Sequence, residues 1–298
     1  MKRFIVFLFL LWCGSLAAQT RITLTDAVTG APVPYANILY GDQQGKYADE
    51  AGTVVIPAGV ETALVSHISY QSLTLDLARL GGPEVRLTPV ATMLAPAVIQ
   101  PKGAGRMKLG HANGKRLSVQ GGRNGYQLAE LFPLPQGGNG RPLITRVQLN
   151  LNPFNLHKVS STRIGDTSYD DCVTYVAKLR VDLRAVDPAS GGPGASLIGG
   201  GVILTLQDKF DLTVHRIYSV DLPQPLLFPE EGVFAAVEWI VTEDVRIQDS
   251  VTPSLWSVAA EDPASSWVKW PLGTPWRPLN APGAATPRSF AISLVTTK

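Results

Sequence analysis

Residues 177–184 read AKLRVDLR, with apolar and charged side chains alternating at every position. A period of two places successive side chains on opposite faces of an extended chain, so this segment predicts a β-strand with one apolar face. The same alternation recurs at residues 146–152 (RVQLNLN) and, closer to the N-terminus, at residues 73–77 (LTLDL). The chain is therefore predicted to be all-β.

The 298 residues are 45% hydrophobic and 17% charged, which is typical of a globular protein with a substantial core. Its 28 glycines and 23 prolines favour many turns and few helices. Strand patterns fill residues 19–90 and 126–298, whereas residues 91–125 show no sustained periodicity. We predict a small β-sandwich, a linker at residues 91–125, and a larger, jelly-roll-like C-terminal β-sandwich.

Residues 1–18 have the pattern of a secretory signal peptide. Lys2 and Arg3 precede an apolar run at residues 4–13, and small residues follow. Cleavage after either Ala17 or Ala18 fits this pattern. Trp12 precedes Cys13, where a lipid-attachment site requires a small residue, so we expect an exported chain without a lipid anchor.

The charge balance argues against a nucleic-acid partner. Without Lys2 and Arg3 the 26 basic residues fall to 24, equal to the 24 acidic residues, whereas nucleic-acid binders normally carry a basic excess. One local excess remains in a stretch without Asp or Glu, which we interpret as either a solvated linker or a contact for anionic sugar lipids of an outer membrane. It comprises Lys102, Arg106, Lys108, Lys115, Arg116 and Arg123.

Three motifs in the first block occur in a recognisable order. They are residues 29–38 (TGAPVPYANI), 47–52 (YADEAG) and 65–70 (VSHISY). Residues 19–90 thereby resemble the carboxypeptidase-like regulatory domain, similar to the domain that precedes TonB-dependent receptors. The resemblance implies a prealbumin-like sandwich without catalytic residues, in a periplasmic protein or one peripherally associated with the outer membrane.

No catalytic motif stands out. None of the four histidines lies in a zinc-peptidase pattern, and there is no G-x-S-x-G elbow, P-loop or G-x-G-x-x-G. We therefore expect a non-enzymatic cell-envelope protein that needs no cofactor. Either it binds a glycan or another envelope component, such as a protein, or it is a purely structural or assembly module without a small ligand.

A tryptophan-rich segment is the candidate binding site. Residues 267–278 read WVKWPLGTPWRP, and its prolines would stiffen the loop. Trp267, Trp270 and Trp276 could stack on sugar rings, with Arg277 binding a hydroxyl or carboxylate group. Trp267 and Trp270 are three residues apart, so in a strand they lie on opposite faces and at least one should be buried. We expect Trp276 to be the most exposed.

An acidic loop is a candidate calcium site. Residues 165–171 (GDTSYDD) contain Asp166, Asp170 and Asp171, and carboxylate oxygens are ligands that Ca²⁺ prefers. The loop lacks the full EF-hand spacing, so a solvated hairpin loop is the alternative.

Overall fold

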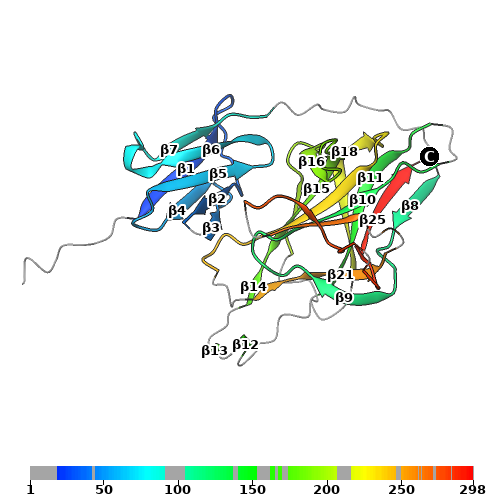
Figure 1. Cartoon of the computed structure of the whole chain (residues 1–298). Coiled ribbons are helices and arrows are strands. Elements are labelled where there is room, and N and C mark those ends of the chain that lie inside the picture. Colours follow the sequence, from blue (N-terminus) through cyan, green and yellow to red (C-terminus); the bar gives the residue numbers. More distant parts are fainter. Residues whose placement is uncertain are drawn as a thin grey trace, which may run out of the picture. The chain divides into compact units, whose positions relative to one another are not determined.

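The computed structural model describes residues 19–41, 44–90, 105–136, 140–152, 162–164, 167–169, 174–206, 216–245, 250–260, 262, 264–270, 273–282 and 284–297 (Figure 1). Its regular elements in these ranges are strands, apart from the short 3-10 helix η1 (Leu77–Arg79). The chain divides into two compact units. The first unit comprises the residues up to Ser66 and Gln71–Pro89. The second comprises His67–Tyr70 and Val90–Lys298. The predicted all-β fold is confirmed.

The first unit is a small sandwich of two sheets. One sheet has the order β4-β1-β7 and the other β3-β2-β5-β6. Alternate side chains such as Ile22, Leu24, Ile38 and Val65 are fully buried between them. The strands are β1 (Thr20–Asp26), β2 (Asn37–Tyr40), β3 (Gln44–Tyr47), β4 (Thr53–Ile56), β5 (Thr62–His67), β6 (Tyr70–Asp76) and β7 (Glu84–Leu87).

The turn between β3 and β4 shows why one of its residues is glycine. Asp49 Oδ1 accepts hydrogen bonds from the backbone N–H groups of Ala51 and Thr53, at 2.9 and 2.8 Å, which closes the turn. Gly52 follows with φ +72°, and a Cβ placed there would lie 2.6 Å from the carbonyl oxygen of Leu24. Both the backbone conformation and the close approach of β1 therefore require glycine.

We expect Gly52→Ala to destabilise the first unit by about 2–4 kcal/mol, because it adds a backbone clash to the cost of a positive φ. Gly59→Ala is the matched control, since Gly59 has φ +81° with nothing within 4 Å of its Cβ position. Its expected cost is about 1 kcal/mol. Urea unfolding measures both, and equal losses would contradict the proposed clash.

The second unit contains two seven-stranded sheets. The first, called here the tryptophan sheet, has the order β16-β15-β19-β10-β22-β23, with β17 also paired to β15. Its strands are β10 (Gln127–Phe132), β15 (Lys178–Val186), β16 (Pro193–Ser196), β17 (Val202–Leu204), β19 (Val233–Ile240), β22 (Ser266–Lys269) and β23 (Arg277–Pro278).

The other sheet, called here the opposite sheet, has the order β24-β21-β11-β25-β8, with β18 paired to β11 and β9 paired to β21. Two further strand pairs, β12 with β13 and β14 with β20, form two-stranded sheets of their own. The strands of this sheet are β8 (Arg106–Gly110), β9 (Arg116–Gln120), β11 (Leu143–Asn152), β18 (Arg216–Leu227), β21 (Ser254–Ala259), β24 (Arg288–Phe290) and β25 (Ile292–Thr297). The separate pairs are β12 (Thr162–Ile164), β13 (Thr167–Tyr169), β14 (Thr174–Val176) and β20 (Ser250–Thr252).

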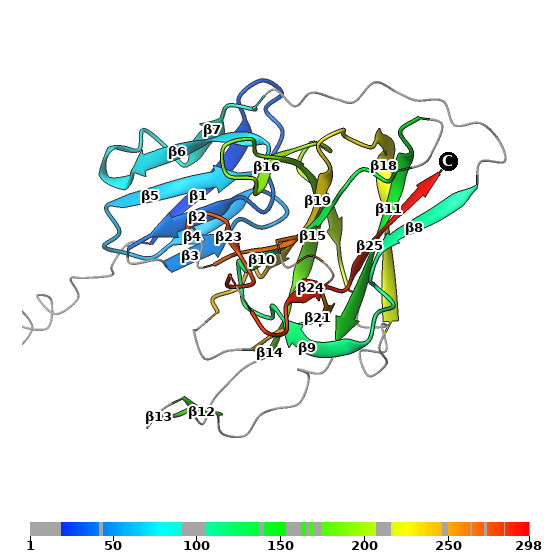
Figure 2. The same ribbon diagram turned by 45° about the vertical axis from the view of Figure 1, so that its right-hand side comes forward.

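The chain crosses repeatedly between these two sheets. Long strands alternate in the order β10, β11, β15, β18, β19 and β21, each in the sheet opposite to the one before (Figure 2). Such crossing connections are typical of jelly rolls. The larger C-terminal sandwich predicted from the sequence is therefore observed.

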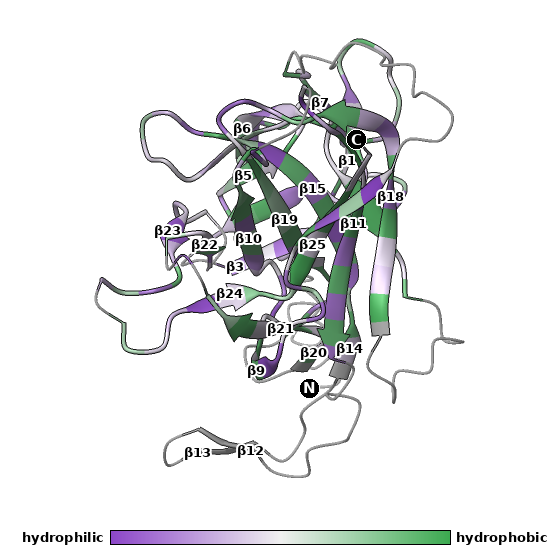
Figure 3. Ribbon diagram, turned by 90° about the vertical axis from the view of Figure 1, so that its right-hand side faces the viewer, coloured by the Kyte–Doolittle hydropathy of each residue, from purple (hydrophilic) through white to green (hydrophobic). Residues whose placement is uncertain are grey.

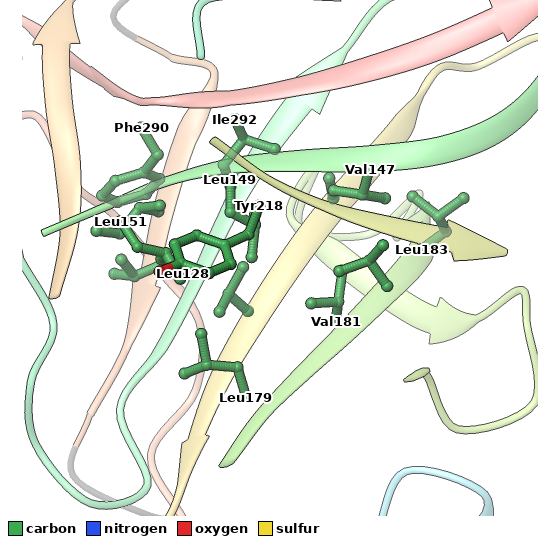
Figure 4. Packing of buried hydrophobic residues seen from close by; sticks show 14 of the residues in the cluster. Leu128, Val147, Leu149, Leu151, Leu179, Val181, Leu183, Tyr218, Phe290 and Ile292 are labelled. Carbon is green, nitrogen blue, oxygen red and sulfur yellow. The ribbon is translucent and has the colours of Figure 1, made fainter. Parts of the chain in front are cut away.

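The core lies between the two sheets. Leu179, Val181 and Leu183 of β15 face Val147 and Leu149 of β11, and all five are fully buried (Figure 4). Polar and apolar residues alternate along β11, as Figure 3 shows by colour. By contrast, all eight residues of β19 are buried, in keeping with its central place in the sheet and its lack of alternation.

The predicted linker is wrong for residues 105–125. β8 pairs with β25, where Leu109 lies opposite Leu294, and β9 pairs with β21, where Val119 lies opposite Trp256. Gly121 then follows so close to Trp239 that a Cβ would lie 2.7 Å from its ring. These residues belong to the C-terminal sandwich, whereas residues 91–104 lie outside the described ranges.

A fragment of residues 105–298 is therefore expected to fold, whereas a fragment of residues 126–298 is not. The shorter fragment lacks β8 and β9, which leaves the edge of β25 unpaired and part of Trp239 uncovered. Circular dichroism and urea unfolding compare the two fragments. Equal unfolding midpoints would contradict the inclusion of β8 and β9 in the sandwich.

Candidate functional site

Two of the predicted tryptophans pack on the outward side of the tryptophan sheet. Trp267 and Trp276 are half-buried against Phe234, Ala129 and Ala236. The ring of Trp267 meets Phe234 edge-on at 6.3 Å, and its indole N–H donates to the carbonyl oxygen of Ala264 at 3.2 Å. Trp267 therefore covers the sheet, and Trp276 is half-buried against the same cluster, so which tryptophan is most exposed stays a prediction.

Trp270 lies in a different environment, at the end of an aromatic row. Trp239 is fully buried in the core, and its backbone N–H donates to the carbonyl oxygen of Tyr126 at 3.0 Å. The ring of Tyr126 lies 6.3 Å from that of Trp239, and 6.5 Å from that of Trp270 on its other side. The row leads from the core to the surface, so the orientation of Trp270 depends on packed neighbours.

Arg123 lies at the outer end of this row, and the positive charge of Arg277 also acts on it. The guanidinium group of Arg123 lies 4.7 Å from the ring centroid of Trp270, a cation–π contact. Burial raises the pKa of the Tyr126 hydroxyl, while the positive charges of Arg277 and Arg123 oppose that rise. Both arginines are exposed. We call Arg123, Tyr126, Trp270 and Arg277 the aromatic–arginine cluster.

The sequence indicated only part of this cluster. Trp270 and Arg277 were candidates, whereas Tyr126 and Arg123 were not. Arg123 belongs to the basic stretch that the sequence predicts to be a solvated linker or a contact for anionic sugar lipids, and the absence of nearby acidic residues is the available signal. Its position over Trp270 could not be read from the sequence, because the two residues are distant in the chain.

The predicted calcium ligands Asp166, Asp170 and Asp171 lie outside the described residues, so calcium binding stays a prediction. The neighbouring segments β12 and β13 pair as an antiparallel hairpin, with Ile164 opposite Thr167. Within the described ranges, no three His, Cys, Asp or Glu side chains gather as a metal site.

An ion-pair network occupies the outward side of β15 and β19. Arg180 Nη1 donates to Glu238 Oε2 at 2.6 Å, and Glu238 also accepts from the Gln127 amide at 2.9 Å. On the next row, Asp182 accepts from Ser196 Oγ at 2.7 Å, and burial raises its pKa to about 6. These charges are engaged with one another, so they contribute to the structure of the sheet.

Glu130 on β10 is a buried carboxylate that sequence reasoning missed, with 4% of its surface exposed. Ser265 Oγ and Ser266 Oγ each donate to it at 2.6 Å, and the backbone N–H of Phe290 donates at 3.0 Å. Burial raises the pKa of Glu130, and these hydrogen bonds oppose the rise. Because donors surround it and little of it reaches solvent, Glu130 joins the two sheets and is not accessible to a substrate.

Comparisons with protein-family models, curated proteins and solved structures found no match to this chain. In the part of the chain that the structure describes, no helix has the length and hydrophobicity needed to cross a bilayer. A functional conclusion therefore depends on the geometry of the chain's own residues.

Glu130→Gln tests the role of the buried carboxylate. The raised pKa means that the folded state binds a proton at Glu130 more tightly than the unfolded state does. Protonation of Glu130 therefore stabilises the fold at pH values below the ordinary pKa of 4.5. This stabilisation is lost as the pH rises through the pKa of the folded state. Over this pH range, we expect the free energy of unfolding of the wild-type chain to fall relative to that of Glu130→Gln. Urea unfolding at several pH values measures the difference.

Glu130→Ala is the companion variant. It removes the shared acceptor of three donors, and we expect a loss of about 3 kcal/mol. A difference between the wild-type chain and Glu130→Gln that does not change with pH would contradict the assignment of a raised pKa.

Proposed function

We propose that this chain is a non-catalytic, exported cell-envelope protein whose C-terminal sandwich binds a glycan through the aromatic–arginine cluster. The observation that carries the proposal is the stacking of exposed Arg123 on Trp270, beside Tyr126 and Arg277. A rigid aromatic ring and donors oriented by packing are the groups that bind sugars at low entropic cost. The row Trp239–Tyr126–Trp270 supplies that rigidity.

Export is supported by the signal-like pattern of residues 1–18. We place the protein in the periplasm or in peripheral association with the outer membrane. This part of the proposal depends on the sequence pattern, because residues 1–18 lie outside the described ranges.

We also propose that residues 19–90 form a carboxypeptidase-like regulatory domain. Its three motifs fall at the entry to β2, at the turn closed by Asp49, and at the connection from β5 to β6. Tyr35 in the first motif has φ 55°, and its hydroxyl donates to Glu50 Oε1 at 2.9 Å. These contacts hold turns together, which supports a structural module without chemistry of its own.

A purely structural or assembly module is the alternative function. The packing of Trp267 and Trp276 on the outward side of the sheet favours it, because these two tryptophans already cover Phe234 and its neighbours. Under this alternative, Trp270 and Arg123 would stabilise the end of the sandwich without binding a saccharide.

Screening the mature chain, residues 19–298, on an array of bacterial envelope glycans distinguishes the two functions. We expect Trp270→Ala to weaken glycan binding by about tenfold or more, because the platform beneath Arg123 is lost. Trp256→Ala is the matched control, since Arg116 lies 5.5 Å from the Trp256 ring centroid on the opposite sheet. It should bind as the wild-type chain does.

Circular dichroism establishes that both variants are folded. Absence of binding to any glycan, or unchanged binding by folded Trp270→Ala, would overturn the glycan-binding function and favour the structural alternative.

A further inference from the structure

We infer that the ligand of the aromatic–arginine cluster is an acidic glycan, one that carries carboxylate or phosphate groups. This inference rests on the proposed function and narrows its ligand class. Arg123 and Arg277 are both exposed and both influence Tyr126. Among the described residues, neither has a carboxylate within ion-pair distance.

Other arginines of the same sandwich are paired. Arg146 Nε lies 2.6 Å from Asp221 Oδ1, and Arg141 Nη1 lies 3.2 Å from Glu230 Oε1, both at the surface. Exposed arginines of this sandwich can thus be matched by carboxylates of the chain itself. Arg123 over Trp270 and the charge of Arg277 on Tyr126, neither matched by a carboxylate among the described residues, form a site complementary to an external anion.

The stacked geometry of Arg123 suits an oxyanion. A guanidinium group over an aromatic face keeps the N–H donors at its edge available, and these can bind a carboxylate or phosphate through two parallel hydrogen bonds. A single neutral hydroxyl carries no negative charge and lacks the paired acceptor oxygens of a carboxylate or phosphate. Because Arg123 covers part of Trp270, an incoming saccharide meets the guanidinium group together with the ring.

The basic residues elsewhere in the same sandwich also favour an anionic ligand. Residues 105–125 contain no Asp or Glu, and the structure places them in the sandwich through β8 and β9. A positive field of this kind attracts anionic ligands and speeds their association. Its exposed members are Arg106, Lys108, Lys115, Arg116 and Arg123.

Calorimetric titration of the mature chain with matched saccharides tests the inference. One pair is hexagalacturonic acid and its methyl ester, and the other is a phosphorylated mannan oligosaccharide and its dephosphorylated form. We expect at least one acidic member to bind about tenfold or more tightly than its neutral counterpart. The pair that shows this difference identifies carboxylate or phosphate as the recognised group.

The variants Arg123→Gln and Arg277→Gln should each weaken binding of the acidic saccharide by about tenfold and reduce its dependence on salt. Arg146→Gln is the control, because this arginine already pairs with Asp221 on the opposite sheet. It should leave the affinity unchanged.

The possible failures are distinguishable. If the acidic and neutral saccharides of each pair bind equally well, and Trp270→Ala abolishes this binding, the acidic preference is overturned but the glycan-binding function is kept. If none of these saccharides binds while glycans on the array do, the inference is also overturned. If no glycan binds in either assay, the glycan-binding function is overturned as well. Equally strong binding to phosphatidylglycerol vesicles would show a general anion-binding surface and overturn recognition of a glycan.

Discussion

The buried carboxylate of Glu130 links the two sheets of the larger sandwich. It accepts from Ser266 of β22 in its own sheet and from the backbone of Phe290 of β24 in the opposite sheet. A buried carboxylate is costly unless its oxygen atoms are satisfied, so these donors must be held in place whenever Glu130 is charged. The relative position of β10, β22 and β24 follows from that requirement.

The same strands carry the candidate site. β10 begins directly after Tyr126, and β22 ends directly before Trp270, so both rings are anchored to strands that meet at Glu130. Trp239 of β19 packs against Tyr126 from the core side. The aromatic–arginine cluster is thus an extension of the core to the surface, which explains why a loop rich in proline and glycine can present an ordered group.

Local patterns in the sequence predicted strands correctly, whereas strands that depend on pairing with distant partners could not be predicted. Alternation along β11 and β15 predicted strands, because the period of two follows from backbone geometry. β8 and β9 fall in a stretch that was predicted to be a linker, because its prolines and glycines come without sustained periodicity. Their structure depends on distant partners, as when Thr296 Oγ1 of β25 donates to the carbonyl oxygen of Met107.

The all-β class, the division into a small and a larger sandwich and the abundance of turns rich in glycine and proline could be predicted from the sequence. The sequence also showed that tryptophans and basic residues were available for binding. The fold shows that Trp267 and Trp276 cover a sheet, while Trp270 lies beneath Arg123. The physical reason is that β-strands pair with partners far along the chain, so the neighbours of a side chain are set by sheet order and register.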